Sequence, residues 1–220
     1  MNSPLLQLLV LAGIAVFLIL RLKSVLGTRD GFEAPSQQHP TPSSTPSRHD
    51  FEVIEGGQDH DITDHVPDKS ESADALAQMK RVDPSFAVGE FLGGAKQAYE
   101  MILMAFESGQ LDDITPFLSE DVFEAFSQGV DARQEQGLHI DAEFIGVRET
   151  TLSEAQFDKD SSRAEITMTF VGELISVVRD SNGEIVEGEP GKSKRQKDTW
   201  TFERIMSSDD PNWRLVATGG

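Results

Sequence analysis

The 220-residue chain contains no cysteine. Without thiols it can form no disulfide framework, no thiolate zinc site and no iron–sulfur cluster, and it has no cysteine nucleophile. Basic side chains are also scarce, because 19 lysines and arginines stand against 38 aspartates and glutamates, a formal net charge of −19 at pH 7. Such an excess of negative charge repels phosphate backbones. The composition therefore argues against nucleic acid as a partner.

Side chains that could carry out catalysis are also few after residue 83, where Tyr99 is the only tyrosine and His139 the only histidine. Tyr99 lies on a predicted helix and is interpreted as a core or rim aromatic, whereas His139 begins a strand on its polar phase and should be exposed. Gly93 and Gly94 lie inside the helix pattern rather than in a phosphate loop, and we expect close packing against a sheet to explain them. The sequence therefore predicts a non-enzyme, with no catalytic residue, cofactor or metal ion.

One long apolar run occurs at the N-terminus, where residues 5–20 read LLQLLVLAGIAVFLIL without a charge. As a helix the run would be roughly 24 Å long, and the stems of Arg21 and Lys23 could extend it toward the roughly 30 Å of a hydrocarbon core. Basic residues follow the run rather than precede it, which disfavours a cleaved signal peptide and places the rest of the chain in the cytoplasm. We expect residues 1–27 to be a single-pass anchor that contacts the lipid bilayer through residues 5–22, a buried helix of a soluble fold being the alternative.

Residues 28–83 lack apolar periodicity and are acidic, with a stretch rich in proline, serine and threonine. This composition is typical of a disordered linker. His60, Asp61, Asp64 and His65 lie within six residues and could ligate zinc or nickel. Nothing nearby would hold such ligands in place, so we interpret them as part of a solvated acidic linker and predict no metal site.

Residues 84–220 have the patterning of a folded domain that begins with helices. Apolar residues recur at helical spacing over residues 91–105. A short helix is expected around residues 112–118, and a longer one opens at Ser119 and closes at Gly137.

Further along the chain the apolar period changes to two, which is the spacing of β-strands. The alternation runs through residues 140–144, 164–170 and 200–202, and a hairpin signal occupies residues 180–183. A last strand is expected over residues 213–217. Helices followed by meandering strands predict an α+β domain in which the helices pack on one face of an antiparallel sheet.

Five segments of this region carry a recognisable pattern. They are FLGGAKQAYEMILMAF (91–106), FLSEDVFEAF (117–126), FVGELISVVRDSNGEIVEG (170–188), DTWTFER (198–204) and DPNWRLVAT (210–218). Together they resemble the Tim44-like domain family, and the anchor and acidic linker give the chain the layout of its short bacterial members, the Tim44-like adaptor proteins. The resemblance implies a cone-shaped fold similar to nuclear transport factor 2, in which a curved antiparallel sheet wraps a long helix and leaves a mostly apolar pocket.

The residues expected to line that pocket are large and apolar. They are Phe91, Ile102, Phe144, Met168, Phe170 and Trp200. Ordinary core packing is the alternative role for each of them.

The resemblance also implies a role at a membrane. In mitochondria the family member holds an Hsp70 chaperone at the inner-membrane import channel. This chain has an anchor and a linker in place of the region that contacts the chaperone, so a chaperone partner stays open. Residues 84–220 hold 26 acidic and 12 basic side chains, a net charge of −14, which argues against docking on anionic lipid headgroups.

We therefore expect an adaptor at the bacterial inner membrane, with its N-terminus outside and its domain in the cytoplasm, that binds a membrane-associated or translocating protein. The alternative is a carrier of lipids or small amphiphiles that uses the apolar pocket. An enzyme is the third possibility.

Overall fold

The computed structural model describes residues 59–219. The predicted anchor and the first part of the predicted linker lie outside these residues. Within the described part, no helix combines the length and the apolarity needed to cross a bilayer. The described residues form a mixed α+β unit with a five-stranded sheet, which confirms the predicted class.

Helices precede strands along the chain. The helical elements are α2 (His60–Thr63), α3 (Glu71–Val82), α4 (Val88–Ser108), the 3-10 helix η1 (Asp112–Phe117) and α5 (Glu120–Glu135). The strands are β1 (His139–Asp158), β2 (Arg163–Arg179), β3 (Ile185–Glu187), β4 (Ser193–Ile205) and β5 (Arg214–Gly219). The strands pair antiparallel in the order β1-β2-β4-β5, and β3 pairs with the end of β2.

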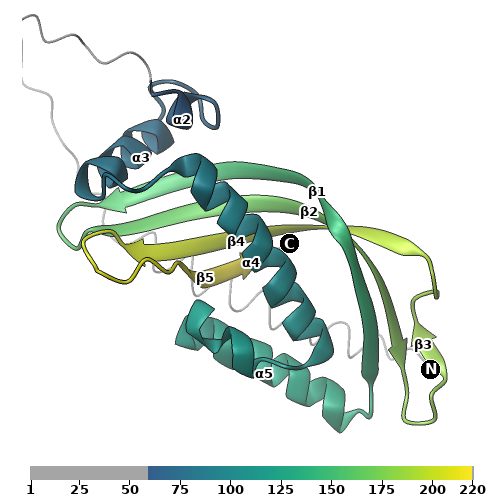
Figure 1. Cartoon of the computed structure of the whole chain (residues 1–220). Helices are drawn as coiled ribbons and strands as arrows, with labels where there is room; N and C mark the ends of the chain where they lie inside the picture. Colours follow the sequence, from purple (N-terminus) through teal and green to yellow (C-terminus); the bar gives the residue numbers. More distant parts are fainter. Residues whose placement is uncertain (1–58, 220) are drawn as a thin grey trace, which may run out of the picture. The chain divides into compact units, whose positions relative to one another are not determined.

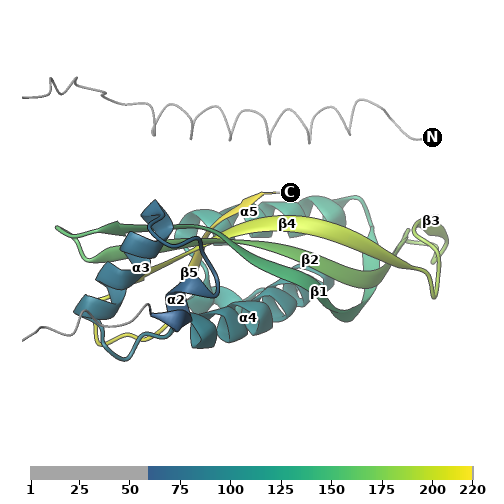
Figure 2. The same ribbon diagram turned by 90° about the horizontal axis from the view of Figure 1, so that it is seen from above.

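The sheet is strongly curved, and α4 runs across its concave side (Figure 1). Along β2 every second residue is buried from Ala164 to Leu174, because these side chains face α4 and form the core. The helix α5 lies beside α4, with the rings of Phe106 and Phe126 4.7 Å apart. Figure 2 shows α2 and α3 at one end of the sheet and β3 at the other.

The edge strand β1 pairs with β2 over its whole length, but its register shifts at three places. The shifts lie between Phe144 and Gly146, between Val147 and Glu149, and between Leu152 and Glu154. An extra residue on one strand bends that strand and increases its twist. These bulges therefore contribute to the curvature with which the sheet wraps α4.

The centre of the core is built around Tyr99 of α4, which has no exposed surface. Its ring stacks on Phe170 at 4.5 Å and lies 4.8 Å from the ring of Trp200. A Cβ atom at Gly172 of β2 would lie 2.5 Å from the Tyr99 hydroxyl oxygen. Glycine at position 172 is thus what lets the tyrosine approach the strand closely.

Residues 59–83, predicted as the end of a disordered linker, are folded. The helix α3 begins at the N-cap Ser70 and buries Leu76 and Met79 completely. The amide of Ala155 on β1 donates a hydrogen bond to the Ser72 hydroxyl, which joins the helix to the sheet. The prediction was wrong here because a four-residue helix and a twelve-residue helix show little periodicity of their own, and their stability comes from tertiary packing. The folded region begins before residue 84.

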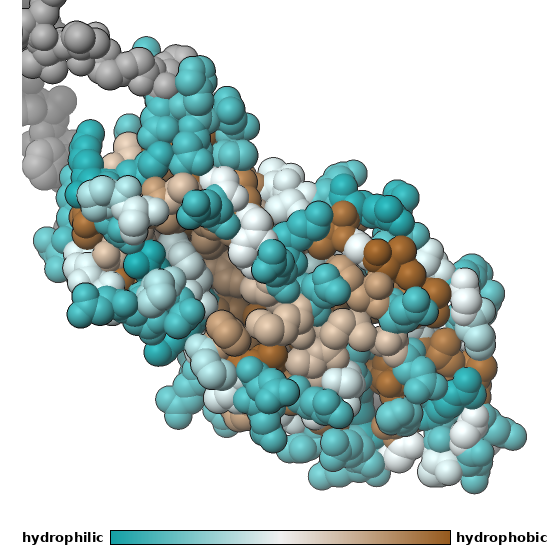
Figure 3. Space-filling model, viewed as in Figure 1, coloured by the Kyte–Doolittle hydropathy of each residue, from teal (hydrophilic) through white to brown (hydrophobic). Residues whose placement is uncertain are grey.

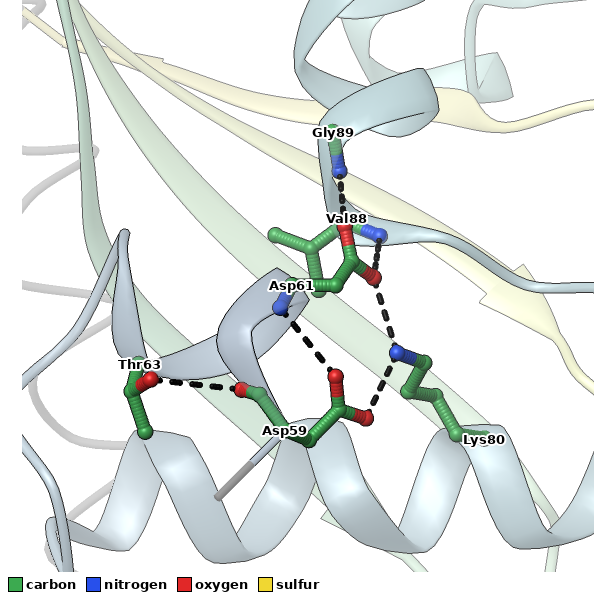
Figure 4. Close-up of polar contacts among 6 residues, drawn as sticks. All are labelled: Asp59, Asp61, Thr63, Lys80, Val88 and Gly89. Carbon is green, nitrogen blue, oxygen red and sulfur yellow. Dashed lines mark hydrogen bonds and ion pairs between the residues drawn. The ribbon is translucent and has the colours of Figure 1, made fainter. Parts of the chain in front are cut away.

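The carboxylate of Asp61 on α2 caps the start of α4 (Figure 4). It accepts hydrogen bonds from the amides of Val88 at 2.7 Å and Gly89 at 2.9 Å. The N-cap residue of α4 is Ala87, which has no side chain able to do this. Lys80 of α3 bridges Asp61 and Asp59 at 2.8 and 2.7 Å, so this polar cluster connects α2, α3 and α4.

Candidate functional site

An open cleft of about 430 Å³ lies beside the N-terminal half of α4. We call it the aromatic cleft. Its lining comes from the α3–α4 connection, α4, η1, the end of β4 and the loop before β5, including Phe86, Phe91, Phe117, Phe202 and Trp213. Figure 3 shows the hollow beside α4, with apolar side chains around it and hydrophilic ones further out.

The aromatic wall of the cleft is a connected cluster of rings. Trp213 lies 4.7 Å from Phe91 and 5.9 Å from Phe86. Phe91 in turn meets Phe202 edge-on at 6.0 Å. Aromatic pairs of this kind are rigid and offer a large apolar area at small cost in conformational entropy. The wall is therefore preformed.

The cleft is also lined by the surface of α4 at Gly94, three residues after Phe91, where the helix carries no side chain. Around a Cβ atom built at Gly94 there is no other atom within 4 Å, and the same is true of Gly93. The sequence led us to expect that these glycines pack closely against the sheet. That prediction is wrong. A glycine inside a helix costs about 1 kcal/mol relative to alanine. Nothing within the described residues accounts for this cost at Gly94.

The rim of the cleft is fixed by Arg204 of β4. Its guanidinium pairs with Asp83 at 3.0 Å, and both side chains are largely buried, with 12% and 14% of their surfaces exposed. Its Nε also donates to the carbonyl of Asp210 at 3.2 Å. Hydrogen bonds from Ser85, and then the charge of Arg204, hold the pKa of Asp83 below its ordinary value. Arg204 thus ties the end of α3 to the loop before β5.

A comparison with known protein families matches residues 72–220 with the Tim44-like domain. The chain belongs to the Tim44-like domain family. The match includes α3 from its second residue onward, which agrees with the finding that this helix is part of the folded domain.

Curated relatives of this Tim44-like protein are mitochondrial. The human mitochondrial import inner membrane translocase subunit TIM44 is 27% identical over 165 residues, which cover 70% of this chain and 36% of the relative. Subunit TIM44-1 of Arabidopsis thaliana is 24% identical over 161 residues, covering 70% and 34%. The chain thus spans about a third of the length of the curated relatives it matches.

Among solved structures, the intermembrane space region of the chloroplast protein ARC6 aligns with 58% of this chain and 94% of its own. The sequence identity is 14% and the TM-score 0.38, a likeness too weak to support any inference.

The six residues predicted to line a pocket of the Tim44-like domain are divided between the cleft and the core. Phe91 lines the aromatic cleft. Ile102, Met168 and Phe170 have no exposed surface, and Trp200 is 4% exposed. These four, with the half-buried Phe144 and the ring of Tyr99, belong to the packed core.

Most of the cleft residues were not predicted from the sequence. Phe86 and Trp213 lie in loops and Phe117 ends η1, so no periodicity marks their direction. They come together only because the loop before β5 folds back over α4. The sequence offered only one signal for the cleft, an aromatic residue in or beside each of three short connecting segments, and this signal is weak.

Two titratable side chains, Tyr99 and Asp198, form a short hydrogen bond inside the Tim44-like domain. The phenol donates to the Asp198 carboxylate at 2.5 Å, and Gln196 donates to the same oxygen at 2.9 Å. Burial, and then the negative charge of Asp198, raise the pKa of Tyr99 far above its ordinary value. The phenol therefore stays neutral and joins α4 to β4.

The remaining candidates for chemistry lie at the surface. The side chain of His139 is 73% exposed, as predicted, and its Nε2 lies 3.4 Å from Asp141. His60 and Asp64 form an exposed pair 3.9 Å apart, while Asp61 caps α4. No group of three or more histidine, aspartate or glutamate side chains in residues 59–219 is arranged to hold a metal ion.

Proposed function

We propose that this protein is a membrane-anchored, non-enzymatic adaptor that holds a segment of a protein partner in the aromatic cleft at the bacterial inner membrane. The observation that carries the proposal is Gly94. A helix surface kept bare in the N-terminal half of α4, beside a rigid aromatic wall, accepts a close approach by another chain. The cost in helix stability is then offset by binding.

The chemistry of the cleft suits a protein segment with an apolar face. Its wall offers large aromatic groups, the residue types that dominate binding energy at protein interfaces. The cleft is open along one side, so a longer chain can enter and leave it. The mitochondrial relatives are named as subunits of an import translocase, which supports a role linked to protein translocation or membrane-protein assembly.

The anchor completes the proposal. Residues 5–22 would span the membrane once and hold the domain on the cytoplasmic side. The domain itself would have the cone-shaped fold of nuclear transport factor 2-like proteins. Because the chain lacks cysteine, topology can be tested with Ser3→Cys and Ser207→Cys variants and a membrane-impermeant maleimide. Labelling of position 3 in cells with a permeabilised outer membrane, and of position 207 only after lysis, is expected. The reverse pattern overturns the orientation.

The binding site is tested by photocrosslinking in intact cells. A photoreactive amino acid replaces Asn212, which lies exposed at the cleft, and crosslinked proteins are identified by mass spectrometry, with cells that are not irradiated as control. A Gly94→Leu variant fills the cleft, whereas Gly93→Leu adds the same side chain next to it. We expect specific protein adducts that Gly94→Leu abolishes and Gly93→Leu keeps. Adducts that both variants retain would contradict the proposal.

A lipid or small-amphiphile carrier is the second candidate, because the cleft volume of about 430 Å³ lies in the range of small-ligand pockets. The same variants decide between the two functions. Lipid that co-purifies with the full-length protein and is lost in Gly94→Leu, together with an absence of protein adducts, would favour the carrier.

A further inference from the structure

The strand β4 extends beyond its neighbour β5. On one side β4 pairs with β2 from Ser193 to Ile205. On the other side β5 pairs only with residues 199–203 of β4. Residues 193–198 therefore form a free strand edge among the described residues, which points toward the β3 end of the sheet (Figures 1 and 2). A free edge offers unpaired backbone donors and acceptors to another extended chain.

This free edge is basic within an acidic domain. Residues 192–197 read KSKRQK and hold four of the 12 basic side chains of residues 84–220. Arg195 shares Glu173 with Arg148. No ion pair joins Lys194 or Lys197 to an acidic side chain of the described residues. The edge thus carries positive charge that the fold itself does not neutralise.

The charges lie on both faces of the strand. Lys194 stands opposite Leu174, which is buried on the α4 side of the sheet. Lys197 stands opposite Val171 and so points to the other side, because successive side chains alternate. A flat anionic surface could meet only one of these faces. An extended segment lying along the edge, with carboxylates on both of its faces, could meet both.

A second copy of this chain is a poor occupant of the edge. Pairing β4 with β4 would bring Lys194, Arg195 and Lys197 of one molecule against the same residues of another. Like charges directly opposite each other across strands are destabilising. The edge therefore disfavours self-pairing and favours a partner of opposite charge.

We propose that residues 193–198 of β4 bind an extended acidic segment of a protein partner, which adds to the sheet as a strand in the position that β5 leaves free. Backbone hydrogen bonds to the edge supply affinity, and Lys194, Arg195 and Lys197 select carboxylates. This surface is separate from the aromatic cleft and does not depend on what the cleft binds. An adaptor with both could hold two segments at once.

The test uses the full-length protein in detergent and a fluorescent peptide, Val-Glu-Glu-Val-Glu-Glu-Val, which carries glutamates on both faces when it is extended. Binding is followed by fluorescence anisotropy. The double variant Lys194→Glu with Lys197→Glu reverses the charge of the edge, and Lys96→Glu with Lys159→Glu makes the same change at exposed lysines elsewhere. We expect the edge variant to weaken binding about tenfold or more, and the control variant to leave it within about twofold.

Two further probes test the strand itself and the class of partner. A peptide with its central valine replaced by proline keeps every charge but cannot pair as a strand, so its binding should fall about tenfold. Equal binding of both peptides would overturn strand addition, as would unchanged binding to the edge variant. If phosphatidylglycerol vesicles bind through Lys194 and Lys197 while the peptide does not, the surface docks on a membrane instead and the proposal fails.

Discussion

The phenol of Tyr99 donates a 2.5 Å hydrogen bond to Asp198 and so joins the middle of α4 to β4. The bond lies inside a cluster of rings, with Phe170 stacked on one face of the tyrosine. Gly172 makes room for the hydroxyl group on β2. The long helix and the strands β2 and β4 thus meet at one polar contact inside the core.

Replacement of Tyr99 by phenylalanine should lower the free energy of unfolding by about 1–3 kcal/mol, because Asp198 loses one of its two donors in a half-buried place. Urea unfolding of residues 59–220, measured against the unmodified domain, checks this. In an Asp198→Asn background the same replacement should cost clearly less. Equal costs in the two backgrounds would mean that the two groups are not coupled.

The raised pKa of Tyr99 predicts how the domain behaves in alkali. A group whose pKa is raised by folding contributes stability below its unfolded pKa, about 10 for tyrosine, and loses it as the pH rises. Since Tyr99 is the only tyrosine, the ultraviolet absorbance of tyrosinate reports on it alone. We expect this absorbance to appear only together with unfolding, seen by circular dichroism. Ionisation of Tyr99 in a still folded domain near pH 10 would disprove its burial.

Removal of the cap by Asp61→Ala should destabilise the domain by about 1–2 kcal/mol at pH 7, the usual cost of losing an N-cap. Burial alone would raise the pKa of Asp61, but hydrogen bonds from Lys80, Gly89 and Val88 outweigh it and leave the pKa below the ordinary 3.8. The stabilisation is therefore present above pH 3.8 and lost as the pH falls through the folded pKa.

Asp64→Ala is a matched control for the cap, because Asp64 lies on the same segment with an exposed side chain. Thermal unfolding of both variants between pH 3 and pH 7, as rough limits around the carboxylate pKa range, separates the two residues. A deficit in Asp61→Ala that persists unchanged in acid would show that its carboxylate charge does not matter.

Leu76→Ala should cost about 2–5 kcal/mol, because Leu76 is completely buried between α3 and the sheet. Val82→Ala on the same helix removes a side chain that is 41% exposed and should change stability by less than about 0.5 kcal/mol. Chemical denaturation of the two variants measures the difference. If neither Leu76→Ala nor Val82→Ala changes the stability, residues 59–83 do not contribute to the folded domain and belong to the linker that the sequence predicted.

The sequence predicted the helices and strands well where each element carries its own pattern. The long helix ends at Gly109, whose φ of 74° provides the left-handed cap, and the second long helix starts after Ser119 as expected. The pattern failed for α3 and for the second half of β1. α3 is amphipathic only over three turns, and the bulges of β1 break the period of two on which its prediction depended.

The functional surfaces could not be predicted in the same way, because they depend on which loops meet. Phe91 was identified from its place on the apolar face of α4, yet its partner Trp213 lies 122 positions further along the chain. The free edge of β4 was also not visible in the sequence. It depends on the register in which β5 pairs with β4, which is a tertiary contact that side-chain alternation does not determine.

Gly94→Ala should stabilise the isolated domain by about 1 kcal/mol, because alanine favours a helix and its Cβ atom meets no other atom. Gly93→Ala should give a similar gain. Differential scanning calorimetry of both variants checks the values. If Gly94→Ala destabilises the domain while Gly93→Ala does not, an internal contact at Gly94 exists after all, and the reason for a bare helix surface beside the cleft disappears.

The three bulges of β1 have a consequence for how the protein behaves in a crowded cell. β1 is an edge strand of 20 residues, long enough to template aggregation if its backbone groups were evenly spaced. Each register shift breaks that spacing, so a second chain could pair with only a few residues of β1 before its hydrogen bonds no longer match. The geometry that curves the sheet around α4 thus also hinders amyloid-like growth along β1, in addition to the cover that α3 gives at Ala155.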